Sequence, residues 1–193
     1  RGVITHSPGE VRVQDRDDPQ IVEPTDAIIK VTAACVCGSD LWPYRGISPL
    51  EEARPMGHEY VGTVVEVGDE VKNVKVGDFV VGSFCLSDNT CEICEDGFQS
   101  RCANGGFMGD TQAEYTRVPQ ADGTLVVVPG GKPEDPEIIA SLLAASDVLG
   151  TGWFGAVAAQ AGPGKTIAVV GDGAVGLSAV LAAKALGAEK VIA

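Results

Sequence analysis

Four residues near the middle of the chain have the types and spacing of a metal site. Asp88, Cys91, Cys94 and Cys102 form the pattern D-x2-C-x2-C-x7-C in a stretch rich in turn residues. A C-x2-C hairpin presents two thiolates at the spacing that tetrahedral zinc prefers, and a third thiolate with a carboxylate would complete the shell. A shell of four protein ligands predicts a structural zinc ion.

Other interpretations of these cysteines stay open. They could be free thiols, or Cys91 and Cys94 could form a redox pair. Cys85 is a rival fourth ligand in place of Asp88, although its spacing is less suitable.

A second group of reactive side chains lies earlier in the chain. The segment Cys37-Gly38-Ser39-Asp40 places a thiol, a hydroxyl and a carboxylate after an apolar strand. His58, one of only two histidines, stands before Glu59 and another apolar run. A lone histidine is more often a hydrogen-bonded structural residue than a ligand. Cys35 is more typical of a buried core thiol.

A glycine-rich turn stands near the end of the chain. Gly171, Gly173, Ala174, Val175 and Gly176 fit G-x-G-x-x-G between an apolar strand expected at 166–170 and a helix expected at 174–186. In that context glycines allow a tight turn and close approach of a pyrophosphate, which predicts dinucleotide binding. The alternative is an ordinary strand-to-helix turn. The residue that separates NAD from NADP falls about 20 positions further on, at the last residue, so the choice is not readable.

The elements that position these residues change in kind along the chain. Short apolar or alternating runs separated by turn residues predict a compact β-barrel or sandwich. Alanine-rich patterns then predict helices, with an interruption at 150–152, and a final strand–helix–strand unit follows. The predicted strands are 3–5, 11–14, 27–34, 61–67, 79–82, 114–118, 125–128, 166–170 and 190–193, and the helices are 137–145, 153–161 and 174–186.

Composition narrows the class of partner. The formal net charge is −13 and the isoelectric point is near 4.4, so nucleic acid is not an expected partner, since binding a polyanion needs clustered Lys and Arg. No apolar run approaches the length of a membrane span, and no signal-peptide pattern opens the chain. We therefore expect a cytoplasmic protein with no membrane partner, whose six cysteines serve as metal ligands or buried thiols.

Five segments of the chain together resemble a known family. CGSDLW, GHEYVG, DNTCEICEDGFQSRC, SDVLGTGW and VVGDGAVG stand in the order and approximate spacing found in zinc-dependent medium-chain alcohol dehydrogenases. The resemblance implies a mixed β and α/β fold. It places a GroES-like β-barrel catalytic domain at 1–150, with a zinc lobe at about 85–105, and the truncated start of a Rossmann NAD(P)-binding domain at 151–193.

The resemblance also implies a catalytic zinc site. Cys37, His58 and Asp147 would be its protein ligands, with Glu59 as an occasional substitute. Asp147 stands where other members carry cysteine. Three protein ligands leave a fourth position where the substrate oxygen binds and an alkoxide is stabilised.

Further residues take roles from the same resemblance. Ser39 resembles the hydroxyl that relays the alcohol proton, and Asp40 resembles the carboxylate that orients the histidine ligand. Thr151 resembles a residue that contacts the nicotinamide ring. Trp42 stands where many members complete the relay with a histidine, so water or cofactor hydroxyls would serve there, and the indole could narrow the substrate pocket.

The expected function is a zinc-dependent interconversion of a small alcohol with an aldehyde or ketone, using NAD or NADP, in a homodimer or homotetramer. One alternative is a zinc-free reductase of the same superfamily. The other is a non-catalytic, zinc-stabilised binding domain. A chain that ends at Ala193 is itself expected to have little activity, because half of the cofactor site is missing.

Overall fold

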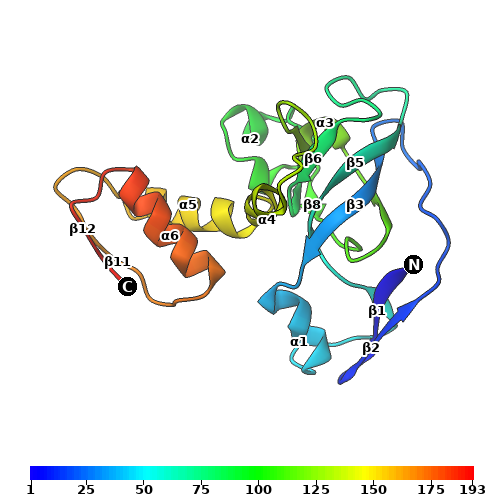
Figure 1. The fold of residues 1–193 in the computed structure, drawn as a ribbon, viewed down its shortest axis with the longest axis horizontal. Coiled ribbons are helices and arrows are strands. Elements are labelled where there is room, and N and C mark those ends of the chain that lie inside the picture. Colours follow the sequence, from blue (N-terminus) through cyan, green and yellow to red (C-terminus); the bar gives the residue numbers. More distant parts are fainter. The chain divides into compact units, whose positions relative to one another are not determined.

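The computed structural model describes residues 1–193 and divides into two compact units (Figure 1). They are Arg1–Leu143 and Ala144–Ala193. The domain boundary expected after Gly150 falls inside helix α5 (Val148–Ala158), and the structure groups that whole helix with the second unit. The reason is that α5 packs extensively on helix α6 (Ala174–Ala185).

The first unit is built mainly from strands. Its strands are β1 (Gly2–Ser7), β2 (Glu10–Gln14), β3 (Ala27–Cys35), β4 (Arg54–Pro55), β5 (Glu59–Val67), β6 (Phe79–Gly82), β7 (Cys85–Leu86), β8 (Gly106–Phe107), β9 (Tyr115–Val118) and β10 (Leu125–Val127). Its helices are short, and the last one runs to the boundary between the units: η1 (Gly38–Asp40), α1 (Leu41–Tyr44), α2 (Glu92–Glu95), η2 (Gln99–Arg101), α3 (Ala121–Thr124) and α4 (Pro136–Ala144).

The strands form one five-stranded antiparallel sheet and smaller sheets beside it. The large sheet has the order β10-β6-β5-β3-β9, and β2-β1-β4 form a three-stranded sheet. The two are joined by residues 112–114, since Gly2 bridges to Ala113 and the Val31 N–H donates to Glu114 O. The predicted strands of this part are confirmed to within one or two residues. The short strands β4, β7 and β8 were not predicted.

Strand β5 is the centre of the core, because its first half is buried on both faces. Tyr60 and Val64 pack with β3 and β9 on one side, while Val61 packs with Phe79 and helix α4 on the other. The Tyr60 ring lies so close to Gly82 that a Cβ at position 82 would come within 1.9 Å of it. A strand buried on both faces is expected to be apolar without alternation, as it is here.

The second unit is a strand–helix–strand unit preceded by a helix. Strands β11 (Thr166–Ala168) and β12 (Lys190–Ile192) pair in parallel, with α6 between them in the chain. This confirms the predicted order, although β11 ends two residues early.

The predicted helix break at 150–152 is wrong, because α5 runs through Gly150 and Gly152. A Cβ at Gly152 would lie 2.5 Å from the Ala179 backbone nitrogen of α6. The glycine therefore permits close helix–helix contact, and the packing on α6 outweighs its low helix propensity.

No single helix of the chain combines the length and the apolar character needed to cross a bilayer; only α4 and α5 taken together would reach both.

Tyr60 offers a test of the core. Its hydroxyl is fully buried with no hydrogen-bond partner, and burial raises the pKa of the phenol. Replacing Tyr60 by Phe keeps the ring against Gly82 and removes an unsatisfied polar group. We expect Tyr60→Phe to raise the free energy of unfolding by about 1 kcal/mol, measured by urea denaturation. The reciprocal control, Phe79→Tyr, should lower it. A loss of stability in Tyr60→Phe would contradict this account.

Candidate metal and cofactor sites

The first candidate site forms where β3 ends and β5 begins. These strands pair antiparallel, with Ala34 opposite Tyr60 and Cys35 opposite Glu59. Cys37, just past β3, and His58, just before β5, are therefore brought together although they are far apart in the chain. The ligand atoms of Cys37, His58 and Glu59 all lie within 4.8 Å of one another.

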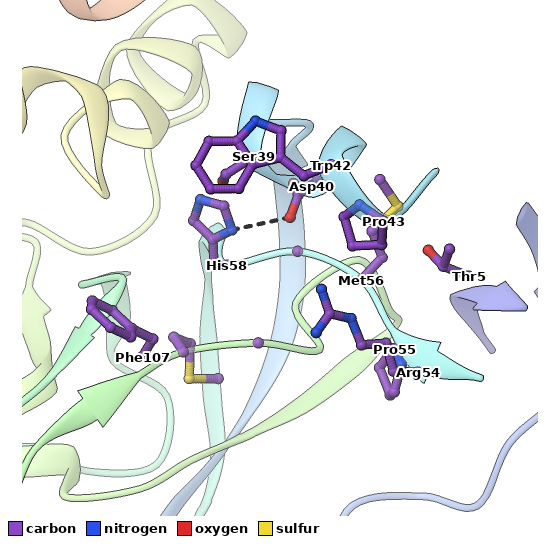
Figure 2. A pocket seen from close by; sticks show the side chains of 13 residues that line it. Thr5, Ser39, Asp40, Trp42, Pro43, Arg54, Pro55, Met56, His58 and Phe107 are labelled. Atoms are coloured by element: carbon purple, nitrogen blue, oxygen red, sulfur yellow. Dashed lines mark hydrogen bonds and ion pairs between the residues drawn. The ribbon is translucent and has the colours of Figure 1, made fainter. Parts of the chain in front are cut away.

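Asp40 orients the histidine of this site. Its Oδ1 lies 3.1 Å from His58 Nδ1 (Figure 2). Its Oδ2 accepts the Cys37 N–H at 3.0 Å. A carboxylate only accepts, so Nδ1 is the donor in this contact, and in the neutral imidazole Nε2 then has the lone pair that a metal needs. The arrangement is the one that metal-binding histidines use, and with the neighbouring thiol it fits a zinc ion.

Two neighbours of the ligands differ in role. Glu59 is buried, and its Oε1 lies 3.9 Å from His58 Nε2, which places a carboxylate beside the proposed ion. Cys35 packs against the core cluster of Val61 and Phe79, and burial raises the pKa of its thiol. Cys35 is thus half-buried at the edge of the core, less buried than predicted.

Asp147 and Thr151 belong to the second unit. Asp147 is the residue that precedes α5, and its Oδ1 accepts the Thr151 Oγ1 hydroxyl at 2.9 Å. Coordination of the same ion by Asp147, and contact of Thr151 with nicotinamide, stay predictions.

A pocket of about 390 Å³ opens beside His58 within the first unit (Figure 2). Ser39, Asp40 and Trp42 line it, and Trp42 is 52% exposed, while the roles assigned to them stay predictions. Phe107 lines its other wall and is 77% exposed.

The sequence analysis did not predict the wall of the pocket that Phe107 forms. The Phe84 ring meets His58 edge-on and stacks on Phe107, with centroids 6.4 Å apart in each pair. Arg54 and Met56 line the pocket as well. Residues in such short strands and loops carry no periodic signal. Arg54 and Met56 could have been suggested only by their closeness to His58 in the chain, and Phe84 and Phe107 had no signal.

The second candidate site is the cysteine lobe. The ligand atoms of Asp88, Cys91, Cys94 and Cys102 all lie within 4.8 Å of one another, and Cys91 Sγ is 3.8 Å from Cys102 Sγ. Asp88 therefore joins the three thiols, whereas Cys85 lies buried in β7. Four donors of this kind fit a tetrahedral zinc ion.

Hydrogen bonds hold the lobe donors in place. Asp88 accepts Asn104 Nδ2 at 2.7 Å and the Thr90 and Cys91 N–H groups, and these bonds lower the pKa of its carboxyl group. The Ala103 N–H, 3.5 Å from Cys91 Sγ, lowers the pKa of that thiol. Burial raises the pKa of Cys94 to about 12, so a bound cation would be needed to make it a thiolate.

The glycine-rich turn has the geometry expected of a nucleotide-binding loop. Gly171 has φ +116°, and a Cβ on Gly176 would lie 2.0 Å from Gly171 O, so turn and helix touch there. Gly173 precedes α6 in extended backbone, with open space where a Cβ would stand. A pyrophosphate fits such a glycine-lined helix N-terminus.

Known proteins match the whole chain. Residues 23–130 match the family model described as the alcohol dehydrogenase GroES-like domain. The chain is 40% identical to "Zinc-type alcohol dehydrogenase B" of Aspergillus flavus, over 94% of this chain and 44% of that protein. It is 36% identical to the glutathione-independent formaldehyde dehydrogenase of Pseudomonas aeruginosa, over 100% of this chain and 53% of that protein.

Solved structures agree with this match. The structure of alcohol dehydrogenase TADH from Thermus sp. ATN1 superposes with a TM-score of 0.87 at 35% identity, covering 99% of this chain and 56% of that one. The chain thus spans about half the length of the curated relatives it matches. With the GroES-like match over more than half of its residues and two metal-ligand clusters in its first unit, the chain belongs to the zinc-dependent medium-chain dehydrogenase/reductase family.

Proposed function

We propose that this chain supplies the catalytic domain and the start of the NAD(P)-binding domain of an oxidoreductase. The enzyme would interconvert an alcohol with an aldehyde or ketone. The observation that carries the proposal is the meeting of Cys37, His58 and Glu59 beside a pocket lined by Ser39 and Asp40. The GroES-like match alone would also fit a zinc-free reductase of the same superfamily, but a thiol and an oriented imidazole are the donors of a zinc site.

In the proposed catalytic site Cys37 Sγ, His58 Nε2 and an Asp147 oxygen hold zinc, with Glu59 as an alternative ligand. When bound, zinc would act as a Lewis acid on the substrate oxygen, and the nicotinamide would accept or donate the hydride. Asp147 is proposed on the family resemblance of its segment and on its position before α5, beside Thr151.

The remaining site residues position the substrate and its proton. The Ser39 hydroxyl both accepts and donates, so it can receive a proton from the alcohol in the pocket and release it. Trp42 stands where a relay histidine would continue the path, and its indole cannot accept a proton. We propose that protons pass from Ser39 to water, while Trp42 shapes the pocket.

The glycine-rich turn is proposed as the pyrophosphate site of NAD(P). The backbone of Gly171, Gly173, Ala174, Val175 and Gly176 would face the phosphates at the start of α6, and Thr151 would lie toward the nicotinamide. The lobe of Asp88, Cys91, Cys94 and Cys102 is proposed to hold a second, structural zinc ion. The cytoplasmic location and the homo-oligomeric state stay predictions.

Zinc content tests the catalytic ligand set. In the full-length protein we expect Cys37→Ser and Asp147→Ala each to lose about one zinc ion per chain and nearly all alcohol turnover, because an ion held by two ligands exchanges readily. Metal analysis and an alcohol panel measure both. Active wild-type protein without zinc would instead support the zinc-free reductase, and a protein that binds zinc but no nicotinamide would support the binding domain.

The Asp40 contact predicts a weaker site when its charge is removed. We expect Asp40→Asn to lower the zinc affinity of the catalytic site about 10- to 100-fold, because the amide no longer orients His58 as a charged acceptor. Competition with a chelator measures the affinity. Asp69→Asn, an exposed turn residue, is the control with the same charge change. Equal zinc retention in both variants would show that Asp40 does not orient the ligand.

The lobe should lose its metal independently of the catalytic site. We expect Cys91→Ser to release about one zinc ion, to increase proteolytic cleavage between residues 88 and 104, and to leave the zinc at Cys37 in place. Metal analysis and limited proteolysis check this. Cys85→Ser is the matched control and should keep both ions. If Cys85→Ser loses the lobe zinc and Asp88→Ala keeps it, the fourth ligand is Cys85.

A further inference from the structure

The pocket beside His58 has one arginine in a lining that is partly polar and partly apolar. Arg54 is the only Lys or Arg among the lining residues. Six apolar side chains line the pocket with it: Trp42, Pro43, Pro55, Met56, Phe107 and Met108. In a small-molecule pocket apolar walls bury the body of the ligand, and placed polar groups fix its orientation.

The backbone that carries Arg54 is held firmly. Arg54 pairs with Thr5 and Pro55 with Ile4, where β4 meets β1. The Met56 N–H donates to Val3 O at 3.1 Å, and Gln112 N–H donates to Met56 O at 3.0 Å.

Gly57 connects this segment to His58 and has φ +105°. A Cβ there would lie 2.9 Å from the Gln112 backbone nitrogen. The base of Arg54 is therefore fixed relative to His58, four residues away.

The guanidinium of Arg54 has no carboxylate within ion-pair distance. In contrast, Arg16 pairs with Asp110 and Arg117 with Asp26. The acidic group that shares the pocket with Arg54 is Asp40, but both of its oxygens are engaged, by His58 and by the Cys37 N–H. Figure 2 shows the Arg54 head group directed into the space between His58 and Met56.

We propose that Arg54 selects substrates that carry a carboxylate at the end remote from the reacting carbon. This inference rests on the proposed function. The substrate would be an alcohol or aldehyde with an apolar body, packed on Trp42 and Phe107, and an anionic end on Arg54. A guanidinium binds a carboxylate through two parallel hydrogen bonds. This part of the protein has a net charge of −13, so a local cation in the pocket would favour an anionic substrate against the surrounding negative potential.

The test compares two substrates that differ only in charge. In the full-length protein kcat/KM is measured for ω-hydroxy acids and for n-alkanols of equal carbon number, such as 6-hydroxyhexanoate and hexan-1-ol. We expect kcat/KM for the hydroxy acid, divided by that for the alkanol, to fall about tenfold in Arg54→Gln. The ratio should recover in part in Arg54→Lys, which keeps the charge but cannot form two parallel hydrogen bonds. Arg45→Gln removes an exposed arginine outside the pocket and should leave the ratio unchanged.

Either of two results would overturn the proposal: a ratio unaffected by Arg54→Gln, or an equal fall in kcat/KM for both substrates, which would mean that Arg54 only shapes the pocket.

A binding measurement separates this proposal from the proposed function. Calorimetry with hexanoate as the probe should give a dissociation constant that rises about tenfold in Arg54→Gln and stays constant in Arg45→Gln. If no alcohol is oxidised but hexanoate binding depends on Arg54, charge selection stands and the oxidoreductase function fails. Hexanoate binding that is absent, or equal in wild type and Arg54→Gln, contradicts the role of Arg54.

Discussion

The first unit depends on the antiparallel pairing of β3 with β5. This pairing places Cys37 beside His58, and a shift of one residue would send every side chain of β5 to the opposite face. The register is constrained by close contact as well as by hydrogen bonds. A Cβ at Gly62 would lie 2.4 Å from Lys30 O, so only glycine allows the two backbones to approach as they do. The chemistry of the site thus follows from how two core strands pair.

Much of the fold was predictable because its elements leave local patterns in the sequence. Strand β5 and its neighbours are short apolar or alternating runs bounded by turn residues, and these local patterns predict strands directly. The cysteine lobe was predictable for a similar reason, because its four donors lie within fifteen positions of one another and sequence spacing translates into spatial spacing. The glycine-rich turn is equally local, since its strand, turn and helix are consecutive.

Features that depend on contact between distant segments were not predictable from local patterns, and the meeting of Cys37 with His58 was expected only through the family resemblance. Gly150 and Gly152 indicate a helix break when only local propensity is considered, yet packing on α6 requires a small residue at position 152 and keeps the helix intact. Phe107, which lines the pocket, stands on the short strand β8 and stacks on Phe84 just before β7, and Arg54 reaches the pocket because β4 pairs with β1. Each of these facts is set by tertiary pairing, and none of them leaves a periodic pattern in the sequence.

In the lobe a bound metal would supply the stability that a hydrophobic core supplies elsewhere. In α2 and the loop after it Cys94 is the one buried residue, while its neighbours are exposed, so little apolar burial is available to order the segment. Its donors would carry four negative charges as one carboxylate and three thiolates. The Asn104, Thr90 and Ala103 donors offset only part of that charge.

Without a cation the Cys94 thiol keeps its proton, as its raised pKa indicates, and any thiolates that form beside Asp88 repel its carboxylate. A divalent ion supplies the missing attraction at the centre of the lobe, and its binding free energy then becomes folding free energy for this segment. The two proposed zinc sites therefore differ in kind. At the first, β3, β5 and Asp40 already hold the thiol and the imidazole in position. At the second, the ion itself would have to hold the segment together.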